Sequence, residues 1–356
     1  MTKGASMLYG LKWLSALTGK RLIKTALSVF ITASVCQFFG WPVIFAVIAA
    51  IVTVEPTVNA SIQKGKIRLP AAAMGAAIAM GLDAALGQTP LAYALSAFFT
   101  IYFCHLFKWD DAIIVATLTA VNMITMTETH YLLNFFVRLG TTSTGIVISI
   151  LVNFLIFPPN FQQAVRKAYQ NIFHQTHQLL EKCLDYHLKQ SGSRMQLNRS
   201  HQSLLKEIDR CMNLVQFQFQ EYRYHRTAPA EIRELKRIQQ NVHILYSVAF
   251  HTGDFITLST DKQVACSRDE ETCIWQAWEA ISNQLLQDAW SRPVQENALD
   301  AACRVNLMHL VHDHTGGTDH DPSSFSKEAS IAYELLAIYR LLEGLHPLGE
   351  SSVRTV

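Results

Sequence analysis

The chain has 356 residues, of which 50% are hydrophobic and 16% are charged, whereas roughly 25% of the residues in an ordinary soluble domain carry a charge. Its formal net charge of +2 excludes a strongly basic nucleic-acid binder, and its hydrophobic content excludes a disordered chain. Residues 1–160 contain ten Lys or Arg and five Asp or Glu, and residues 161–356 contain twenty and twenty-three, so a membrane-type part precedes a soluble-type part.

Residues 21–158 contain six apolar stretches that are predicted to be transmembrane helices. The stretches are Leu22–Phe39, Pro42–Val54, Leu69–Gly87, Pro90–Phe107, Ala112–Thr127 and Phe136–Phe157. Several are shorter than the roughly 20 residues that cross about 30 Å of hydrocarbon. Residues 1–20 lack the compact apolar core and the cleavage site of a signal peptide, so we expect them to form a cytoplasmic N-terminal segment.

The positions of Lys and Arg next to these stretches predict the orientation, because positively charged loops stay on the cytoplasmic side. Basic residues lie before or at the start of the first stretch, before the third, and after the fourth and sixth, as Lys24, Lys64, Lys108 and Arg166 illustrate. The opposite loops, near residues 40 and 87–89, carry no basic residue. Both termini are therefore expected in the cytoplasm.

A comparison of the chain with itself at an offset of seventy residues predicts an internal repeat. The residues Ile44, Ala46, Ala50, Thr57, Arg68, Leu69, Gly75 and Ile78 match Ile114, Ala116, Ala120, Thr127, Arg138, Leu139, Gly145 and Ile148, and Asp83 falls opposite Asn153. Three spans in each copy is an odd number, so the second copy must be inverted across the bilayer. The expected fold is all-α: six transmembrane helices as an inverted 3+3 repeat, followed by a cytoplasmic helical bundle.

Residues 159–356 are expected to form that cytoplasmic helical domain, because apolar residues recur there at helical spacing. The predicted helices are Phe161–Lys189, Gln196–His225, Ala230–Phe255, Asp269–Trp290, Glu296–His312 and Ser323–Glu343. At the end of the fifth of these helices and in the loop after it, possible metal ligands crowd together: His309, His312, Asp313, His314, His320 and Asp321. They complete no known ligand motif, so a solvated polar loop is the preferred interpretation, and we expect no metal and no cofactor.

Ionisable side chains in the apolar part are candidate functional residues, because they are costly inside a bilayer. Arg68 and Arg138 could each hold a carboxylate by two parallel hydrogen bonds, or could serve as interfacial anchors. Glu55 precedes Pro56, where the second span is expected to break, and could exchange a proton or simply cap the turn. Asp83 is a second candidate for proton coupling, with a helix-packing or lumen-facing role as its alternative.

Polar residues also mark the fifth span, where Thr119 and Asn122 lie three residues apart on one helical face. Asn122 and Thr125 have the same spacing, and Thr127 also belongs to this polar stripe. The face shared by Thr119, Asn122 and Thr125 could line a polar path for a substrate, or could form hydrogen bonds between helices. The sequence contains no G-x-S-x-G, no H-E-x-x-H and no P-loop motif, so we do not expect an enzyme.

Several motifs together suggest a family. They are Trp41–Ala46, Ile51–Val58, Lys64–Ala71, Phe135–Thr142, and Asn153-Phe154 before Pro158-Pro159. With them the chain resembles the bacterial aromatic acid exporter family, which is related to the fusaric acid resistance proteins. The resemblance covers residues 20–160 densely and the remainder less specifically.

This resemblance implies efflux of small aromatic carboxylic acids across the bacterial cell membrane, coupled to the proton gradient. We also expect a homo-oligomer embedded in the lipid bilayer. Two alternatives stay open. The layout is distantly similar to that of plant anion channels of the malate type, which keeps an organic-anion channel in consideration. The membrane part could also anchor a ligand-sensing or regulatory helical domain.

Overall fold

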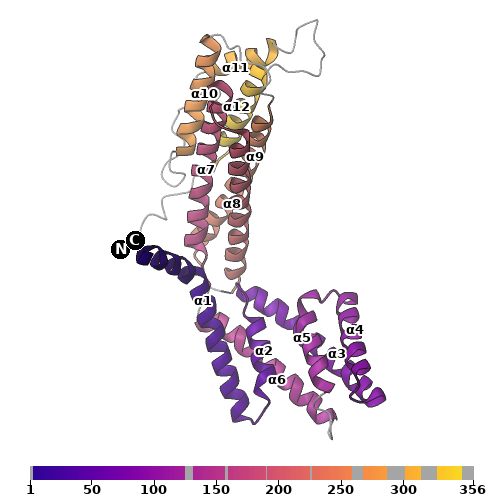
Figure 1. The fold of residues 1–356 in the computed structure, drawn as a ribbon. Helices are drawn as coiled ribbons and strands as arrows, with labels where there is room; N and C mark the ends of the chain where they lie inside the picture. Colours follow the sequence, from indigo (N-terminus) through magenta and orange to yellow (C-terminus); the bar gives the residue numbers. More distant parts are fainter. Residues whose placement is uncertain are drawn as a thin grey trace. The chain divides into compact units, whose positions relative to one another are not determined.

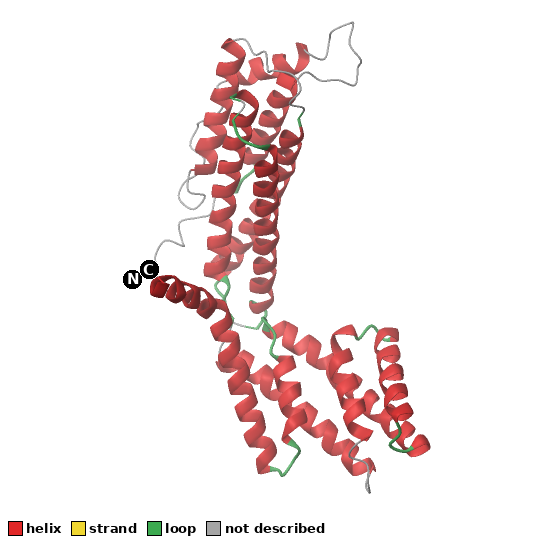
Figure 2. Cartoon of the chain, viewed as in Figure 1, coloured by secondary structure: helices red, strands yellow, loops and turns green. Residues whose placement is uncertain are grey.

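The computed structural model describes residues 3–124, 131–156, 159–189, 191–224, 227–258, 268–286, 301–313 and 327–346. Within these ranges every regular element is a helix, as Figure 2 shows. The chain divides into two compact units, Met1–Asn160 and Phe161–Val356.

The described residues of the first unit form six α-helices and two short helical segments. These are α1 Lys3–Phe38, α2 Val43–Thr53, α3 Val58–Leu86, α4 Pro90–Leu106, the 3-10 helix η1 Asp110–Ala112, α5 Ile113–Ile124, α6 Tyr131–Leu151 and the π-helical η2 Val152–Ile156 (Figure 1). Among the helices that the structure describes, three stretches are long and apolar enough to cross a membrane: Arg21–Phe38, Val58–Leu86 and Leu133–Leu155. The apolar helices α2 and α4 are shorter.

The third helix begins earlier than the apolar pattern predicts. Its first residue is Val58 rather than Leu69, because the Thr57 hydroxyl caps the helix by accepting a hydrogen bond from the backbone N–H three residues later at 3.1 Å. Arg68 therefore lies in the middle of α3 and not at the head of a helix, and Pro70 is accommodated within it. The apolar pattern missed this first part of α3 because it is rich in polar and basic residues.

Two turns of the first unit have the same backbone conformation. After α1, the N–H of Trp41 donates to the carbonyl five residues earlier at 2.8 Å, and Gly40 has a φ of 68°. After α4, the N–H of Trp109 makes the same bond at 2.8 Å, and Lys108 has a φ of 58°. Lys108 thus adopts a left-handed conformation that favours glycine, and the corresponding residue of the first turn, Gly40, is a glycine.

Two glycines allow close approach of helices in equivalent ways. A Cβ atom on Gly75 of α3 would lie 2.6 Å from the carbonyl oxygen of Ala116 in α5. A Cβ atom on Gly145 of α6 would collide with the carbonyl oxygen of Ala46 in α2. The two glycines are seventy residues apart in the sequence, and so are the two alanines. The packing of α3 on α5 therefore corresponds to the packing of α6 on α2.

The six helices predicted for the second unit are confirmed in type and order over the residues that the structure describes; the predicted parts at 287–290, 296–300 and 323–326 lie outside them. They are α7 Gln162–Leu188, α8 Arg194–Glu221, α9 Pro229–Thr257, α10 Arg268–Leu286, α11 Ala301–Asp313 and α12 Lys327–Glu343. Their buried apolar side chains form one continuous core, to which each helix contributes: Leu180, Ile208, Leu245, Ile281, Leu307 and Leu335 are examples. The helical spacing of apolar residues identified these helices because each buries one face in this core.

Candidate functional site

The predicted helix break at Glu55 is confirmed, since α2 ends at Thr53, α3 begins at Val58, and the four residues between them are not helical. Ser61, on the first turn of α3, supports this link. Its hydroxyl donates to the carbonyl of Thr53 at 3.1 Å and accepts a hydrogen bond from the N–H of Glu55 at 3.3 Å. These bonds replace helix bonds that are interrupted at the break, and they fix the backbone from which the Glu55 side chain projects.

The Glu55 carboxylate is held by two basic side chains of α3. Its Oε1 lies 3.2 Å from Nη2 of Arg68 and 3.3 Å from Nζ of Lys64. Arg68 is buried, and its Nη1 donates to the carbonyl of Val52 at 2.9 Å while its Nε donates to that of Asp111 at 3.4 Å. All three guanidinium nitrogens therefore have partners, so this arginine is already committed to contacts within the chain.

Two further residues, from other helices, join this hydrogen-bonded group. Asn153, in the π-helical η2, donates from Nδ2 to the Ser61 hydroxyl at 3.0 Å and to the Glu55 carbonyl at 3.2 Å. Its Oδ1 accepts a hydrogen bond from Lys24 of α1 at 2.8 Å. We call Lys24, Glu55, Ser61, Lys64, Arg68, Asp111 and Asn153 the break cluster.

Sequence reasoning did not select Lys24 or Asn153 as site residues. Lys24 was used only to orient the spans, and Asn153 was noted only as the counterpart of Asp83 and as part of a motif. The presence of an asparagine within an apolar span could have indicated that Asn153 is a candidate site residue. The π-helical turn that carries it cannot be inferred from residue pattern, although such turns are frequent at functional sites.

Arg138 has a different environment, although it stands seventy residues after Arg68. Its guanidinium carbon lies 3.2 Å from the centroid of the Phe45 ring, in cation–π contact. The side chain is buried, and its Nε and Nη1 atoms have no hydrogen-bond partner among the residues that the structure describes. This guanidinium therefore keeps donors available for an anion.

A small cavity, about 10 Å³ in volume, adjoins Arg138 between α2, α5 and α6. Its lining consists of Phe45, Ile48, Ala49, Val115, Leu118, Thr119, Arg138 and Thr142. Such a volume is about that of one water molecule, so the described conformation does not hold an aromatic molecule there. We call this the Arg138 cavity. It combines a buried cation, an aromatic ring and two hydroxyl groups.

The two polar residues predicted to share a face of α5 are placed differently. Thr119 lines the Arg138 cavity, and its hydroxyl donates to the carbonyl of Val115 at 2.7 Å. Asn122 is absent from the cavity lining and donates from Nδ2 to the carbonyl of Leu118 at 2.7 Å. The remaining members of the stripe, Thr125 and Thr127, lie outside the described residues.

Asp83 is buried, but it is far from the break cluster along the chain. It lies on α3 fifteen residues after Arg68, which corresponds to roughly 22 Å at the rise of an α-helix. The two acidic residues considered for proton coupling, Glu55 and Asp83, are therefore not brought together.

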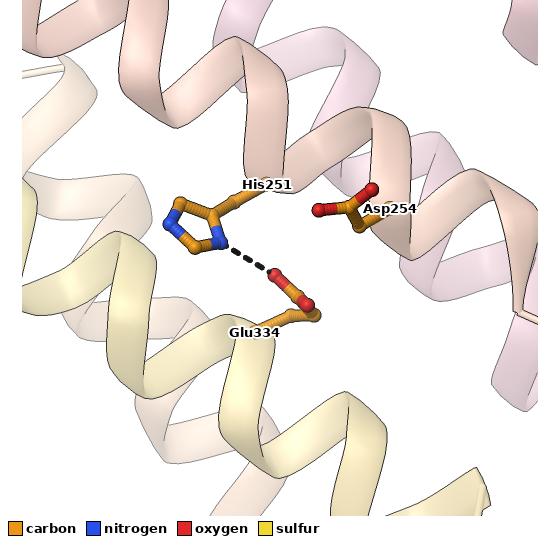
Figure 3. A group of neighbouring side chains, drawn as sticks. All are labelled: His251, Asp254 and Glu334. Atoms are coloured by element: carbon orange, nitrogen blue, oxygen red, sulfur yellow. Dashed lines mark hydrogen bonds and ion pairs between the residues drawn. The ribbon is translucent and has the colours of Figure 1, made fainter.

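The histidine-rich stretch considered as a metal site is only partly described. His309 and His312 are exposed on α11, while His314, His320 and Asp321 lie outside the described residues. The structure instead assembles another group of potential ligands between α9 and α12, which comprises His251, Asp254 and Glu334 (Figure 3). The three-residue spacing of His251 and Asp254 shows that they share a helix face. Their proximity to Glu334, which lies on another helix, could not be predicted from the sequence.

Comparisons with known proteins identify relatives for almost the whole chain. Residues 16–156 match the model described as aromatic acid exporter family member 1, and residues 120–351 match the fusaric acid resistance protein family. A UPF0421 protein of Bacillus cereus is 34% identical, over 95% of this chain and 96% of its own length. UPF0421 proteins of Oceanobacillus iheyensis and Staphylococcus saprophyticus are each 32% identical over 93% of this chain, and over 95% and 98% of their own lengths. The resemblance in the sequence motifs is thereby confirmed.

Proposed function

Because the chain belongs to the fusaric acid resistance protein family, and its residues 16–156 match aromatic acid exporter family member 1, we propose that it exports aromatic carboxylic acids across the bacterial cell membrane. The observation that carries the choice of substrate is Arg138. This buried guanidinium faces an aromatic ring and retains donors without partners among the described residues. A carboxylate would supply the missing acceptors, and the ring of the substrate would pack among the apolar side chains that line the cavity.

The proposed architecture is six transmembrane helices in an inverted 3+3 repeat. The two matching turns at Trp41 and Trp109 support it, as do the equivalent close approaches at Gly75 and Gly145. Repeats of this kind commonly hold substrate near the midplane, between the two copies. The Arg138 cavity fits that expectation, because its lining comes from α2 of the first copy and from α5 and α6 of the second.

We also propose that both termini and the helices of residues 159–356 lie in the cytoplasm, and that the protein is a homo-oligomer. The distribution of Lys and Arg supports the orientation. Replacing single exposed residues by cysteine tests it, at Gln88 in the link between α3 and α4 on one side and at Asn198 on α8 on the other. A membrane-impermeant thiol reagent added to whole cells should label only the cysteine at position 88.

Glu55 is the proposed proton-coupling residue. Its carboxylate is the acceptor shared by Arg68 and Lys64, so a proton on Glu55 would remove the charge that holds both cations next to the helix break. The break cluster could then open and close as the proton binds and leaves. Asp83, buried in the other half of α3, is the second candidate for a proton site.

Of the remaining candidates for substrate binding, Thr119 is supported by its place in the Arg138 cavity. Arg68 and Asn122 have less support, because Arg68 is engaged within the break cluster and Asn122 does not line the cavity.

Transport by the purified full chain in proteoliposomes tests this function. With an imposed proton gradient, we expect 4-hydroxybenzoate to move and 4-hydroxybenzyl alcohol, which lacks the carboxylate, not to move. Glu55→Gln should abolish the response to the gradient while leaving exchange of hydroxybenzoate across the membrane.

Movement of hydroxybenzoate that ignores the gradient in the unmodified protein would overturn the coupling. Electrical current that follows the anion gradient alone would identify an organic-anion channel instead. Equal transport of the acid and the alcohol would overturn the role of Arg138, since a guanidinium binds only the former by charge.

A further inference from the structure

Three side chains that can bind a metal ion meet between two helices of the second unit. His251 and Asp254 lie three residues apart on α9, so they share one face of that helix. Glu334 projects toward them from α12 (Figure 3). His251 Nδ1 lies 2.9 Å from Glu334 Oε2, and ligand atoms from all three residues lie within 4.8 Å of one another.

The electrostatics of this group favour a cation. Glu334 is only 8% exposed, and its ion-pair partner is His251, which carries a charge only when it is protonated. Burial has the largest effect on the pKa of Glu334 and raises it. The hydrogen bond and charge of His251 lower this pKa, and the nearby charge of Asp254 raises it. Two carboxylates are thus held close together next to one imidazole, and an ion between them would relieve their repulsion.

We propose that His251, Asp254 and Glu334 bind a divalent transition-metal ion, with Zn²⁺ as its representative. Ligand atoms around tetrahedral zinc lie about 2.0–2.2 Å from the ion, and so roughly 3.3 Å from one another. The present spacing of 2.9 Å between Nδ1 and Oε2 needs to widen by only a few tenths of an ångström. The imidazole nitrogen distinguishes this site from the all-oxygen sites of Mg²⁺ and Ca²⁺.

The exposure of the group suits an ion with an open coordination position. The side chain of His251 is 26% exposed and Asp254 is exposed, whereas Glu334 forms the buried base of the site. Three protein ligands with one solvent-facing position is a common arrangement for zinc. Since α9 and α12 contribute ligands separately, the ion would fasten the last described helix to the middle of its unit.

A simple His251–Glu334 ion pair is the competing explanation, and the two differ in what they require of Asp254. An ion pair needs only the two residues joined at 2.9 Å. A metal site also needs the carboxylate of Asp254 as its third ligand. Asp254 is exposed, so replacing it by asparagine should leave the fold intact and test the metal site directly.

The experiment uses the untagged full chain in detergent, stripped with a chelator and dialysed against Zn²⁺ at neutral pH. We expect one Zn²⁺ per chain in the unmodified protein, and affinity at least about tenfold weaker in Asp254→Asn and in Glu334→Gln. His243→Asn, an exposed histidine on the same helix, is the matched control and should bind as the unmodified protein does. The bound ion should also raise the midpoint of thermal unfolding in the unmodified protein and in this control, but not in Asp254→Asn.

Binding that is equal in Asp254→Asn and in the unmodified protein would overturn the proposal, as would the absence of stoichiometric binding. Loss of binding only in a His309→Asn, His312→Asn double variant would assign the ion to α11 and overturn it as well. If Glu334→Gln fails to fold, Asp254→Asn decides alone. The ligands all belong to the second unit and the readout is metal binding, so the result is independent of the proposed transport.

Discussion

Arg68 and Arg138 occupy equivalent positions in the internal comparison, yet their surroundings are opposite. Arg68 donates from all three guanidinium nitrogens to Glu55 and to two backbone carbonyls. Arg138 lies against Phe45, with two of its nitrogens lacking partners among the described residues. A buried cation that is fully paired stabilises the structure around it, whereas one that lacks acceptors costs folding free energy and is suited to bind an anion.

The reason for the difference is partly visible in the residues themselves. Glu55 pairs with Arg68, and the residue seventy positions after Glu55 is Thr125. The second copy of the repeat therefore has no carboxylate at the corresponding position of the chain. The two copies of the repeat thus place their arginines in different environments. The following substitutions test whether Arg68 stabilises the fold and Arg138 binds substrate, as proposed.

The largest expected effect is on transport. Arg138→Met should reduce hydroxybenzoate transport in proteoliposomes about 100-fold, since two hydrogen bonds to a charged carboxylate contribute about 3 kcal/mol or more together. The midpoint of thermal unfolding should stay the same or rise, because an uncompensated buried charge is removed. Arg138→Lys keeps the charge without the paired donors and should be intermediate. Full transport by Arg138→Met would remove the distinction between the two arginines.

The next effect is on stability and concerns the other arginine. Arg68→Met should lower the free energy of unfolding by about 2 kcal/mol, because it leaves the Glu55 carboxylate with Lys64 alone and the Val52 carbonyl without its donor. Thermal unfolding in detergent measures this loss. The double variant with Glu55→Gln should lose less than the sum of the single variants. Additive losses would contradict a direct interaction between these two side chains.

The third effect tests the symmetry of the framework. Gly145→Ala and Gly75→Ala should each destabilise the protein by about 1–3 kcal/mol, because the added methyl group meets a backbone carbonyl of the facing helix. Gly81→Ala is the matched control, since nothing lies within 4 Å of its Cβ position, and it should stabilise by up to about 1 kcal/mol. Comparable thermal shifts in the first two variants are expected if the copies pack alike; a shift in only one would break the comparison.

The smallest effect is expected at Thr119. Thr119→Val keeps the shape of the side chain and removes a hydroxyl that already donates to the Val115 carbonyl at 2.7 Å. Hydroxybenzoate transport should change by less than about threefold, which corresponds to about 0.6 kcal/mol. A loss as large as that of Arg138→Met would make Thr119 a direct ligand of the substrate.

Much of the helical framework was predictable from local pattern. The six helices of the second unit follow from apolar residues at helical spacing, and the break at Glu55 follows from the proline after it. The start of α3 did not follow, because the residues before Leu69 are polar and basic and resemble a loop. A capping threonine and tertiary contacts of Ser61 and Arg68 make them helical.

The candidate sites divide in the same way. Arg138, Glu55 and Thr119 could be selected as single residues, because ionisable and polar side chains stand out in apolar segments. The pairs of residues that meet in the break cluster and between α9 and α12 could not be selected, because their members are far apart in the sequence. Lys24 and Asn153 are 129 residues apart, and His251 and Glu334 are 83 residues apart.

The sequence by itself determined the helical class, the contrast between an apolar and a charged half, and the family to which the chain belongs. Periodicity, composition and short motifs are properties of neighbouring residues and survive without a fold. Only the tertiary structure decided which arginine is paired and which carboxylates meet a histidine. Hydrogen bonds and ion pairs act over a few ångströms, so they depend on which distant segments the packing of the helices brings together.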